Sequence, residues 1–350
     1  MLRILVTGGA GFIGSHTSLV LLKEAHEILV IDSFINSSLK SLEKVQEIIK
    51  TENKDWHGKL TIIKGDIRDK DVLDNIFLNA RNQNKPIDAV LHFAGLKSVE
   101  ESFELSLEYW DVNISGTINL LKVMKKYDCK TIVFSSSASI YKKSDGNLIK
   151  ENYEIHPSNP YGLTKYNVEL ILKNIFDDDS KNWRIACLRY FNPIGAHSSG
   201  LIGECSKKLP NNIFPFINLV ALGKIKELKI FGNDWPTKDG TGIRDYIHVM
   251  DLAEGHFEAL KFLLKGEPRF LTLNLGTGLG TSVLELIKTF SKVNKVKIPF
   301  SYSSKRKGDQ CTVIADCSLV KKILKWEAKR DLEQMCKDGW NWQLNNPNGY

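Results

Sequence analysis

A tyrosine and a lysine, Tyr161 and Lys165, lie four residues apart in a stretch that predicts a helix. Positions i and i+4 of a helix share one face, so the lysine ammonium can lie beside the tyrosine phenol and favour its anion. A free phenol ionises near pH ~10, and bringing that pKa to about 7 requires roughly 4 kcal/mol, at ~1.4 kcal/mol per unit. A desolvated lysine and a cationic cofactor ring can together supply this stabilisation. The pair predicts a base that takes a proton from a hydroxyl group, although the same spacing also occurs on helices without a catalytic role.

Ser137 is a third candidate, because it ends an apolar stretch over residues 131–137 that predicts a strand. Its hydroxyl can hydrogen-bond the substrate oxygen that Tyr161 deprotonates. Serine is also common at strand ends, where its hydroxyl bonds the backbone. Ser137 therefore gains meaning from the elements that position it.

Those elements begin with a glycine loop at the amino terminus. Residues 2–7 predict a short strand, residues 8–14 read Gly-Gly-Ala-Gly-Phe-Ile-Gly, and a helical stretch follows. Gly8 permits the tight turn, Gly11 lets the backbone approach a pyrophosphate, and Gly14 permits close packing of helix on strand. The free N–H groups at the helix start would face the phosphates. This order predicts a dinucleotide-binding loop.

Asp32 favours NAD as the dinucleotide. It follows a second predicted strand, residues 27–31, and lies 18 residues after Gly14, close to the spacing of an acid that binds the ribose 2′-hydroxyl. Its charge would repel the 2′-phosphate of NADP. A plain turn is the alternative interpretation of the loop and Asp32.

Further apolar strands are predicted at residues 60–65, 89–95 and 131–137, each followed by a helical stretch. This alternation is typical of an α/β fold with a Rossmann-type, doubly wound parallel sheet that is covered on both faces. Ligands of such sheets bind beyond the carboxyl ends of the strands. The candidates at those ends are Asp66, Phe93, Ala94, Lys97 and Ser137.

Composition disfavours several classes of function. The 350 residues are 42% hydrophobic and 25% charged, as in ordinary soluble proteins, and we see no apolar run long enough to cross a bilayer. The net charge of +7 is spread along the chain, so nucleic acid is not an expected partner. The six cysteines and eight histidines lack metal-ligand spacing, so we expect no metal site, free thiols and a cytoplasmic location.

The order of these features resembles a known family. The glycine loop, Asp32, Asn113, Ser137, Tyr161 and Lys165 together resemble the extended short-chain dehydrogenases/reductases. Longer and more specific blocks closely resemble the UDP-glucose 4-epimerase family within that superfamily, and the resemblance covers essentially the whole chain. These blocks are residues 92–97, 134–138, 188–197, 230–233, 239–253 and 340–350.

This resemblance implies an isomerase of galactose metabolism. In the implied reaction Tyr161 takes the proton from the sugar 4-hydroxyl while hydride leaves C4 for tightly bound NAD. The 4-keto sugar then turns over in the site, and hydride returns to its other face. Lys165 would lower the pKa of Tyr161 and hold the nicotinamide ribose, and Ser137 would hydrogen-bond the 4-oxygen. UDP-glucose and UDP-galactose would be the substrates.

The resemblance also implies two sets of binding residues. The substrate set holds the diphosphate, the nucleotide and the sugar; besides Ser137 and Tyr161 it comprises Asn192, Asn212, Phe231, Arg244, Arg306, Asp309 and Val313. For Arg244 a salt bridge with Asp245 or Asp251 is the alternative interpretation, and for Arg306 it is a solvated basic loop. The cofactor set comprises Gly8, Gly11, Phe12, Ile13, Gly14, Asp32, Asn36, Ser37, Asp66, Ile67, Phe93, Ala94, Lys97, Asn113, Tyr161, Lys165 and Tyr190.

Three positions modify the family picture. The residue four past Asp309 is tyrosine in family members restricted to glucose and galactose, and here it is Val313. We therefore expect a pocket that also accepts the N-acetylated sugars UDP-GlcNAc and UDP-GalNAc. Lys142 and Glu100 stand where glycine is more usual, which affects loop conformation rather than the reaction.

Two other functions compete with this one. An NAD-dependent sugar-nucleotide 4,6-dehydratase shares the fold and the first hydride transfer, but needs an Asp-Glu pair after the position of Ser137, where this chain has Ala138-Ser139. A regulatory nucleotide sensor on the same fold would have no use for the base. We expect an NAD-binding domain over residues 1–185 and a substrate domain over 186–350, with elements that cross back. A homodimer through helices near residues 104–127 and 160–176 is expected by resemblance.

Overall fold

The computed structural model describes residues 1–52, 59–142, 146–205, 210, 212–306 and 309–350. The chain divides into two compact units that are each discontinuous in sequence. Unit 1 comprises residues 1–140, 157–189 and 253–273, and unit 2 comprises residues 141–156, 190–252 and 274–350. From the sequence we expected one domain boundary near residue 185, with some elements that cross back. In the structure the chain passes between the units at residues 140, 156, 189, 252 and 273.

Unit 1 is built on a seven-stranded sheet whose strand order is β11-β6-β5-β4-β1-β2-β3. The pairs β1–β2, β2–β3, β1–β4 and β4–β5 are parallel. The order reverses beside β1, as in doubly wound sheets, so the predicted fold class is confirmed. The strands are β1 (Arg3–Thr7), β2 (Glu27–Asp32), β3 (Lys59–Lys64), β4 (Ala89–His92), β5 (Thr131–Ser137), β6 (Arg184–Tyr190) and β11 (Arg269–Leu275).

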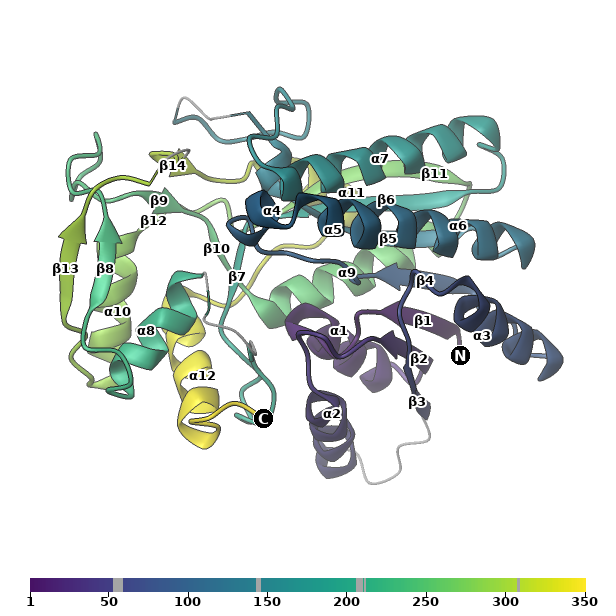
Figure 1. The fold of residues 1–350 in the computed structure, drawn as a ribbon, viewed down its shortest axis with the longest axis horizontal. Coiled ribbons are helices and arrows are strands. Elements are labelled where there is room, and N and C mark those ends of the chain that lie inside the picture. The colour runs from purple at the N-terminus through teal and green to yellow at the C-terminus, as the bar shows by residue number, and fades with distance from the viewer. Residues whose placement is uncertain (53–58, 143–145, 206–209, 211, 307–308) are drawn as a thin grey trace. The chain divides into compact units, whose positions relative to one another are not determined.

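Helices cover both faces of this sheet because alternate strand residues are apolar on each side. Leu5, Ile31 and Val90 belong to one core with helices α3, α6 and α7, whereas α1 packs against β1 and β2. Figure 1 shows α6 and α7 over one face, and α1 and α9 against the other. The helices are α1 (Phe12–Lys23), α2 (Leu39–Glu52), α3 (Lys70–Asn82), α6 (Gly116–Lys126), α7 (Pro160–Asp178) and α9 (Val249–Leu264).

Short helices connect the ends of the central strands to the longer helices. Between β4 and α6 the chain forms α4 (Glu101–Glu104), α5 (Ser106–Trp110) and the π-helix η1 (Asp111–Ser115). After β5 it forms the 3₁₀ helix η2 (Ala138–Ile140). A π-helix is rare and often occurs at a functional site.

Unit 2 is a smaller α/β unit with three short sheets. Its own core gathers apolar residues of α8, α10 and α12 around β8 and β10. Strand β10 (Tyr246–His248) pairs with β7 (Asn192–Ile194), β13 (Phe300–Ser303) pairs with β8 (Leu228–Phe231), and β9 (Ile243–Arg244) lies between β12 (Thr281–Ser282) and β14 (Thr312–Val313). The helices are α8 (Ile213–Ala221), α10 (Val283–Asn294), α11 (Ser318–Leu324) and α12 (Leu332–Asn345).

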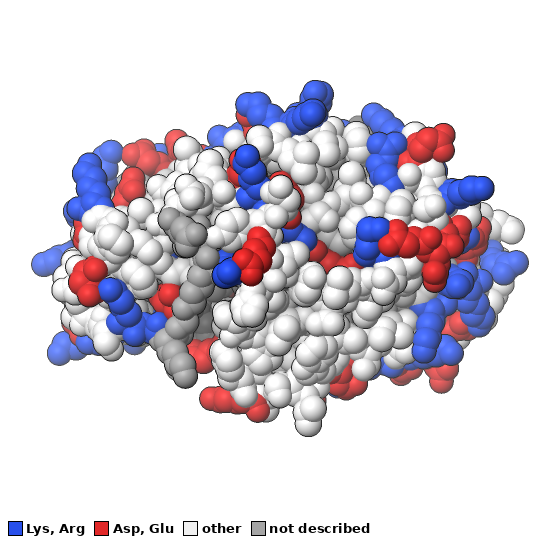
Figure 2. Space-filling model, turned by 90° about the horizontal axis from the view of Figure 1, so that it is seen from above, with Lys and Arg blue, Asp and Glu red and all other residues white. Residues whose placement is uncertain are grey.

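Charged side chains of both signs occur on the face of the molecule that Figure 2 shows. Figure 2 shows acidic and basic side chains interspersed on the visible face, with wide uncharged areas between them. Among the described residues, no helix has both the length and the apolar character that crossing a membrane requires. All six cysteines are free.

Candidate functional site

Helix α7 and strand β5 bring the three predicted catalytic residues together. Asn159 caps the helix by accepting a hydrogen bond from the Gly162 N–H at 2.8 Å, and Pro160 stands in the first turn, where its missing N–H costs nothing. Tyr161 therefore lies in the first turn of α7 and Lys165 one turn later. Ser137 is the last residue of β5, and its side chain acts to lower the pKa of the Tyr161 phenol.

Lys165 is buried and held in one direction. Its ammonium donates to the Ser135 carbonyl oxygen at 2.8 Å and lies 5.0 Å from the centre of the Phe134 ring. The centre of the Tyr161 ring is 5.9 Å from the same nitrogen. The loop after β4 also approaches it closely, because a Cβ at Gly95 would lie 3.8 Å from the Lys165 nitrogen.

Burial dominates the ionisation of this pair. It raises the pKa of Tyr161, and the hydrogen bond from Ser137 opposes that rise. Burial also lowers the pKa of the Lys165 ammonium, to about 8. The direction for Tyr161 is opposite to the lowering by Lys165 that the sequence led us to expect, because removal from water penalises the phenolate more than its neighbours stabilise it.

The glycine loop forms a tight cradle at the amino end of α1. Gly8 has φ +68°, and a Cβ there would lie 2.6 Å from the Ala94 nitrogen, so glycine is required on both counts. A Cβ at Gly14 would lie 2.4 Å from the Gly8 carbonyl oxygen, whereas one at Gly11 would come within 3.3 Å of that oxygen and of nothing else described within 4 Å. Packing thus requires Gly8 and Gly14, but it leaves Gly11 to be explained by the close approach of a ligand, which fits a pyrophosphate.

Asp32 is buried at the end of β2 and organises the second half of the cradle. One carboxylate oxygen accepts from the Ala10 N–H at 2.9 Å, and the other accepts from the Phe34 N–H at 2.9 Å and the Ser37 hydroxyl at 2.7 Å. Two carboxylate oxygens offer about four acceptor sites. The predicted pair Asp32 and Ser37 therefore lies together, with acceptor capacity left for a ribose hydroxyl.

Asp66 lies after β3 and is held by a residue that sequence reasoning missed. Arg68 donates to its two carboxylate oxygens at 3.1 and 2.8 Å, and these bonds lower the pKa of Asp66. The same guanidinium also pairs with Asp111 of η1 at 2.8 Å. The neighbouring Ile67 is buried, and its side chain packs at Gly116. A sequence gap of 43 residues between Arg68 and Asp111 left no local signal for this link.

Asn113 serves the framework of the site. It lies in the π-helix η1 and accepts from the Leu96 N–H at 2.8 Å. Both hydrogens of its amide are used within the protein, on the Leu96 carbonyl at 3.1 Å and the Thr164 hydroxyl at 2.9 Å. An amide has only two donor hydrogens, so Asn113 joins the loop after β4 to α7 and has no donor left for the cofactor.

The remaining cofactor candidates lie around the same edge of the sheet. Phe12 and Ile13 open α1 and are partly buried, and Tyr190 is buried at the end of β6. Phe93 and Ala94 directly follow β4 and are partly buried, whereas Asn36 and Lys97 are exposed in loops.

Unit 2 gathers a separate cluster of predicted substrate residues. Arg244 of β9 donates to one oxygen of Asp309 at 2.5 Å, and Arg306 approaches the other at 3.4 Å. The Arg306 guanidinium also lies 4.7 Å from the centre of the Phe231 ring, a cation–π distance. Val313 of β14 pairs with Arg244 across two parallel strands.

The contacts of Arg244 and Arg306 bear on the alternative interpretations of each, a salt bridge with Asp245 or Asp251 for Arg244 and a solvated basic loop for Arg306. Arg244 pairs with neither predicted acid, because Asp245 is buried among backbone donors and Asp251 pairs with Arg330. Its partner is Asp309, and its side chain is only 18% exposed. Arg306, at 57% exposed, does lie in a solvated loop, but one oriented by Phe231 and Asp309.

Four further residues that the sequence singled out make other contacts or are exposed. Asn192 lies in β7, where its N–H donates to the Asp245 carbonyl at 3.0 Å. Asn212 is exposed at the start of α8. Lys142 pairs with Glu154 at 2.7 Å, and Glu100 is exposed at the start of α4.

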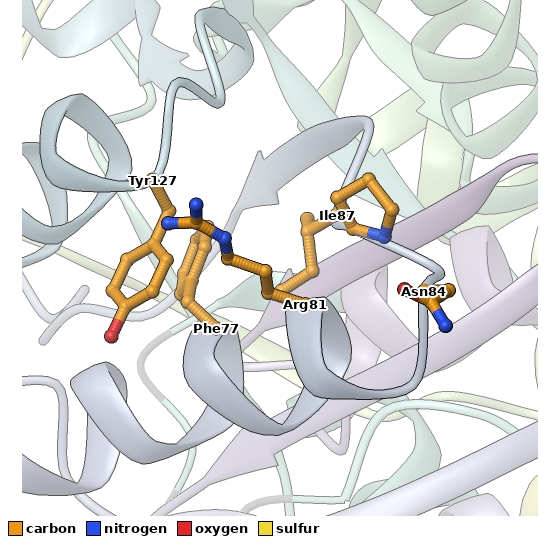
Figure 3. Close-up of a pocket in the computed structure, with 6 residues that line it drawn as sticks. Phe77, Arg81, Asn84, Ile87 and Tyr127 are labelled. Carbon is orange, nitrogen blue, oxygen red and sulfur yellow. The ribbon is translucent and has the colours of Figure 1, made fainter.

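A cavity of unit 1 contains none of the predicted residues. It has a volume of about 330 Å³ and lies between the carboxyl ends of α3 and α6. Figure 3 shows the Arg81 guanidinium beside the Tyr127 ring, two of the side chains that line this cavity. Among the described residues, no group of His, Cys, Asp and Glu could hold a metal ion.

Comparisons with known proteins place these clusters in a family context. The family model described as GDP-mannose 4,6 dehydratase matches residues 5–339. The UDP-glucose 4-epimerase of Bacillus subtilis is 48% identical over 350 residues, covering 100% of this chain and 99% of that protein.

The chain is also similar to solved structures of UDP-glucose 4-epimerases. A UDP-glucose-4-epimerase from Stenotrophomonas maltophila, with bound NAD and formylated UDP-arabinopyranose, is 43% identical with a TM-score of 0.92, covering 99% of this chain and 98% of that one. A UDP-glucose 4-epimerase from Bifidobacterium longum, in complex with NAD+ and UDP, is 42% identical with a TM-score of 0.91, covering 99% and 100%.

Proposed function

The chain belongs to the UDP-glucose 4-epimerase family, and from that premise we propose that it interconverts UDP-glucose and UDP-galactose by inversion at C4, with NAD as its cofactor. The observation that carries this proposal is the position of Tyr161 one helical turn before a buried Lys165, which is anchored on the Ser135 carbonyl two residues from Ser137. Such an arrangement can hold and move one proton at a sugar hydroxyl.

Each of the three side chains has a distinct task in this reaction. Tyr161 takes the proton of the 4-hydroxyl group and later returns it. Ser137 holds the 4-oxygen against the phenol, and Lys165 opposes the rise in pKa that burial imposes on Tyr161. Bound NAD supplies the acceptor for the hydrogen on C4 and gives it back to the opposite face of the 4-keto sugar.

The cofactor would lie on the cradle formed by the glycine loop. Its pyrophosphate fits the approach that Gly11 leaves open at the start of α1, and a ribose fits the remaining acceptor capacity of Asp32. Asp66, fixed by Arg68, lies at the end of the next strand. The carboxylate of Asp32 favours NAD over NADP because it would repel a 2′-phosphate.

The arginines of unit 2 suit the diphosphate of the substrate. A guanidinium binds phosphate oxygens with two parallel hydrogen bonds. Arg244 and Arg306 share Asp309 as a partner, so a diphosphate would compete with one carboxylate for two cations. Phe231, which is 38% exposed, would offer its ring to the uracil.

The residues of η2 disfavour the alternative function, that of a 4,6-dehydratase. Elimination of water from the sugar needs an acid and a base directly after Ser137 in addition to Tyr161. Ala138 and Ser139 occupy those positions, and Ser139 instead donates its N–H to the Ser137 hydroxyl oxygen at 3.1 Å. The broad family model carries a dehydratase name, but these residues lack the proton donor.

One assay separates the three functions. Purified protein with NAD is incubated with UDP-galactose, and the products are resolved by nuclear magnetic resonance. We expect UDP-glucose to form until both sugars are at equilibrium. A 4-keto-6-deoxy product would instead identify a dehydratase, and binding without turnover would identify a sensor.

We also propose that the pocket accepts N-acetylated sugars. Val313, partly buried in β14, is smaller than the tyrosine of restricted family members, so an acetamido group would find room there. Purified protein should then turn over UDP-GlcNAc, and Val313→Tyr should lose that activity while it keeps UDP-galactose. Robust turnover of UDP-galactose without any turnover of UDP-GlcNAc by the unchanged protein would contradict the proposal.

We also propose that the protein forms a homodimer and works in the cytoplasm. Apolar side chains are exposed on helices α5 and α7: Leu107 (83%), Trp110 (36%), Leu163 (38%) and Leu170 (42%). These two helices contact each other in unit 1, so their exposed residues can form one face for a second copy. Six free cysteines are typical of a reducing compartment.

A further inference from the structure

A buried charge network lies one helical turn beyond Lys165. Glu169 accepts from the Ser136 hydroxyl at 2.5 Å and from the Arg189 Nε at 3.0 Å on one oxygen, and from the Arg189 Nη2 at 2.6 Å on the other. The Arg189 and Glu169 side chains are 5% and 6% exposed, and Ser136 is fully buried.

This network joins three elements next to the catalytic trio. Glu169 belongs to α7, Ser136 to β5, and Arg189 to the adjacent strand β6. Ser136 lies between Ser135, whose carbonyl holds Lys165, and Ser137. Helix α7 is therefore fastened to β5 at Lys165 and again at Glu169, four residues and about 6 Å further along the helix axis.

The chemistry of the network favours a single geometry. A charge buried without a partner is strongly unfavourable, and a guanidinium that engages both carboxylate oxygens fixes orientation as well as distance. Sliding or rotation of α7 on β5 would break these bonds and the Lys165 anchor together.

We propose that Glu169, Arg189 and Ser136 are positioning residues for the epimerase reaction. They hold α7 on β5 so that Tyr161 and Lys165 stay within reach of Ser137. The proposal rests on the proposed function, because it concerns the placement of that same base. A displacement of about 1 Å at a reacting group can lower a rate about 100-fold.

A second buried pair provides a matched control. Arg3 and Glu27 lie 2.7 Å apart at 6% exposure each, at the starts of β1 and β2. These are the amino-terminal ends of parallel strands, whereas Ser137 is at a carboxyl end. The control pair therefore stabilises the same sheet without contact to the catalytic trio.

The test replaces each pair by apolar side chains of similar volume, because such replacement of a buried ion pair usually preserves the fold. For Glu169→Leu/Arg189→Met we expect a fall of about 100-fold in kcat for UDP-galactose, with little change in KM or in bound NAD. For Glu27→Leu/Arg3→Met we expect unchanged kcat. Ser136→Ala, which keeps the ion pair, should give an intermediate loss of kcat.

The pH profile distinguishes positioning from general destabilisation. The Ser137 hydrogen bond opposes the rise in pKa of Tyr161, so loosening it should move the acidic limb of kcat to higher pH. Lys165 is a titratable neighbour of Tyr161, with its nitrogen 5.9 Å from the centre of the phenol ring. His92 is close enough to Lys165 to feel its charge, and burial lowers the pKa of His92 to about 3. His92 is therefore neutral across the profile and does not produce the shift.

Retention of wild-type kcat and pH profile by Glu169→Leu/Arg189→Met would overturn the proposal, as would an equal loss of kcat in the control pair. If the unchanged protein does not turn over UDP-galactose, the proposed function fails instead. The network is then tested by titrating Tyr161 through ultraviolet difference spectra against Tyr161→Phe. An unaltered titration in the double variant overturns the positioning role, and a titration moved to higher pH supports it.

Discussion

Burial acts on Tyr161 and Lys165 in opposite directions. It raises the pKa of the phenol and lowers that of the ammonium, to about 8. Both shifts favour neutral groups, so the protein alone opposes the tyrosinate that the reaction needs. A cationic nicotinamide bound beside the phenol would reverse this balance, which couples the strength of the base to the presence of the cofactor.

The buried ammonium of Lys165 predicts a specific stability change. Its folded pKa of about 8 lies below its ordinary value of 10.5, so the unfolded state binds the proton more tightly and folding carries a penalty below pH 8. That penalty is roughly 3 kcal/mol, at ~1.4 kcal/mol per unit. We expect Lys165→Met to raise the free energy of unfolding at pH 7 by up to about this amount, while kcat collapses.

The sign of the linkage sets the pH window for this measurement. Wild-type stability should rise from pH 8 to 10.5 relative to Lys165→Met, and above that window the advantage of the variant should be lost. Denaturant unfolding of both proteins across this range measures the difference. A variant that is less stable than wild type at pH 7 would contradict the assignment of a desolvation penalty to Lys165.

Some of these residues could be predicted from sequence and others could not. Tyr161 and Lys165 share a helix face at a fixed spacing, and Ser137 ends an apolar strand, so local patterns reveal them. Arg68 links Asp66 to Asp111, and Glu169 pairs with Arg189. The partners Arg68 and Asp111, like Glu169 and Arg189, lie on elements that are far apart in sequence. Such pairs depend on tertiary packing, and a single sequence carries no local signal for it.

Secondary-structure elements, like residues, could be predicted only where a local sequence pattern marks them. The strands β1 to β5 of the central sheet were predicted because each is a short apolar run between turns, whereas β6 and β11 of the same sheet were not predicted. The π-helix η1 was not predicted, because its sequence suits an ordinary helix; in the structure its Asn113 hydrogen-bonds Leu96 and Thr164, which lie far from it in sequence. The strands β9, β12 and β14 have only two residues each, too few for periodicity to indicate.

The glycine loop gives a prediction at the scale of one element. Gly11→Ala adds a Cβ whose nearest described neighbour is 3.3 Å away, whereas Gly14→Ala places one 2.4 Å from a backbone oxygen. We therefore expect Gly11→Ala to keep a near wild-type melting temperature but to lose at least about tenfold in NAD affinity, since the methyl group occupies the path of the pyrophosphate. Calorimetric titration with NAD and thermal unfolding measure the two effects.

Gly14→Ala is the comparison for this loop. Its Cβ collides with the backbone, so the loop must move, and we expect losses in both melting temperature and NAD affinity. Equal NAD affinity of Gly11→Ala and the unchanged protein would argue against pyrophosphate binding at this position.

At the scale of the whole molecule, unit 1 carries the glycine loop and the proposed base Tyr161, and unit 2 carries Arg244 and Arg306, the proposed ligands of a diphosphate. Because the chain crosses between the units repeatedly, neither corresponds to one continuous half of the sequence. The single boundary near residue 185 came from motif order, which records where site residues lie along the chain but not where each segment packs.

The proposed dimer gives a prediction at this scale. Leu107→Glu puts a charge on the most exposed apolar side chain of α5, so association through α5 and α7 should fail because a buried, unpaired carboxylate is unfavourable. Light scattering after size-exclusion chromatography should find a dimer for the unchanged protein and a monomer for the variant. Leu279→Glu, at a residue that is 70% exposed in unit 2, is the control that should remain dimeric; a dimeric Leu107→Glu protein would refute this interface.

The central claim is that the hydrogen removed from C4 is the hydrogen returned to it. Incubation of the protein and NAD with UDP-galactose that carries deuterium at C4, in ordinary water, tests this claim directly. We expect UDP-glucose that retains deuterium at C4, because the hydride would be held by NAD and returned without exchange with solvent. UDP-glucose that has lost the deuterium to water would contradict it, since C4 would then have been inverted through proton exchange.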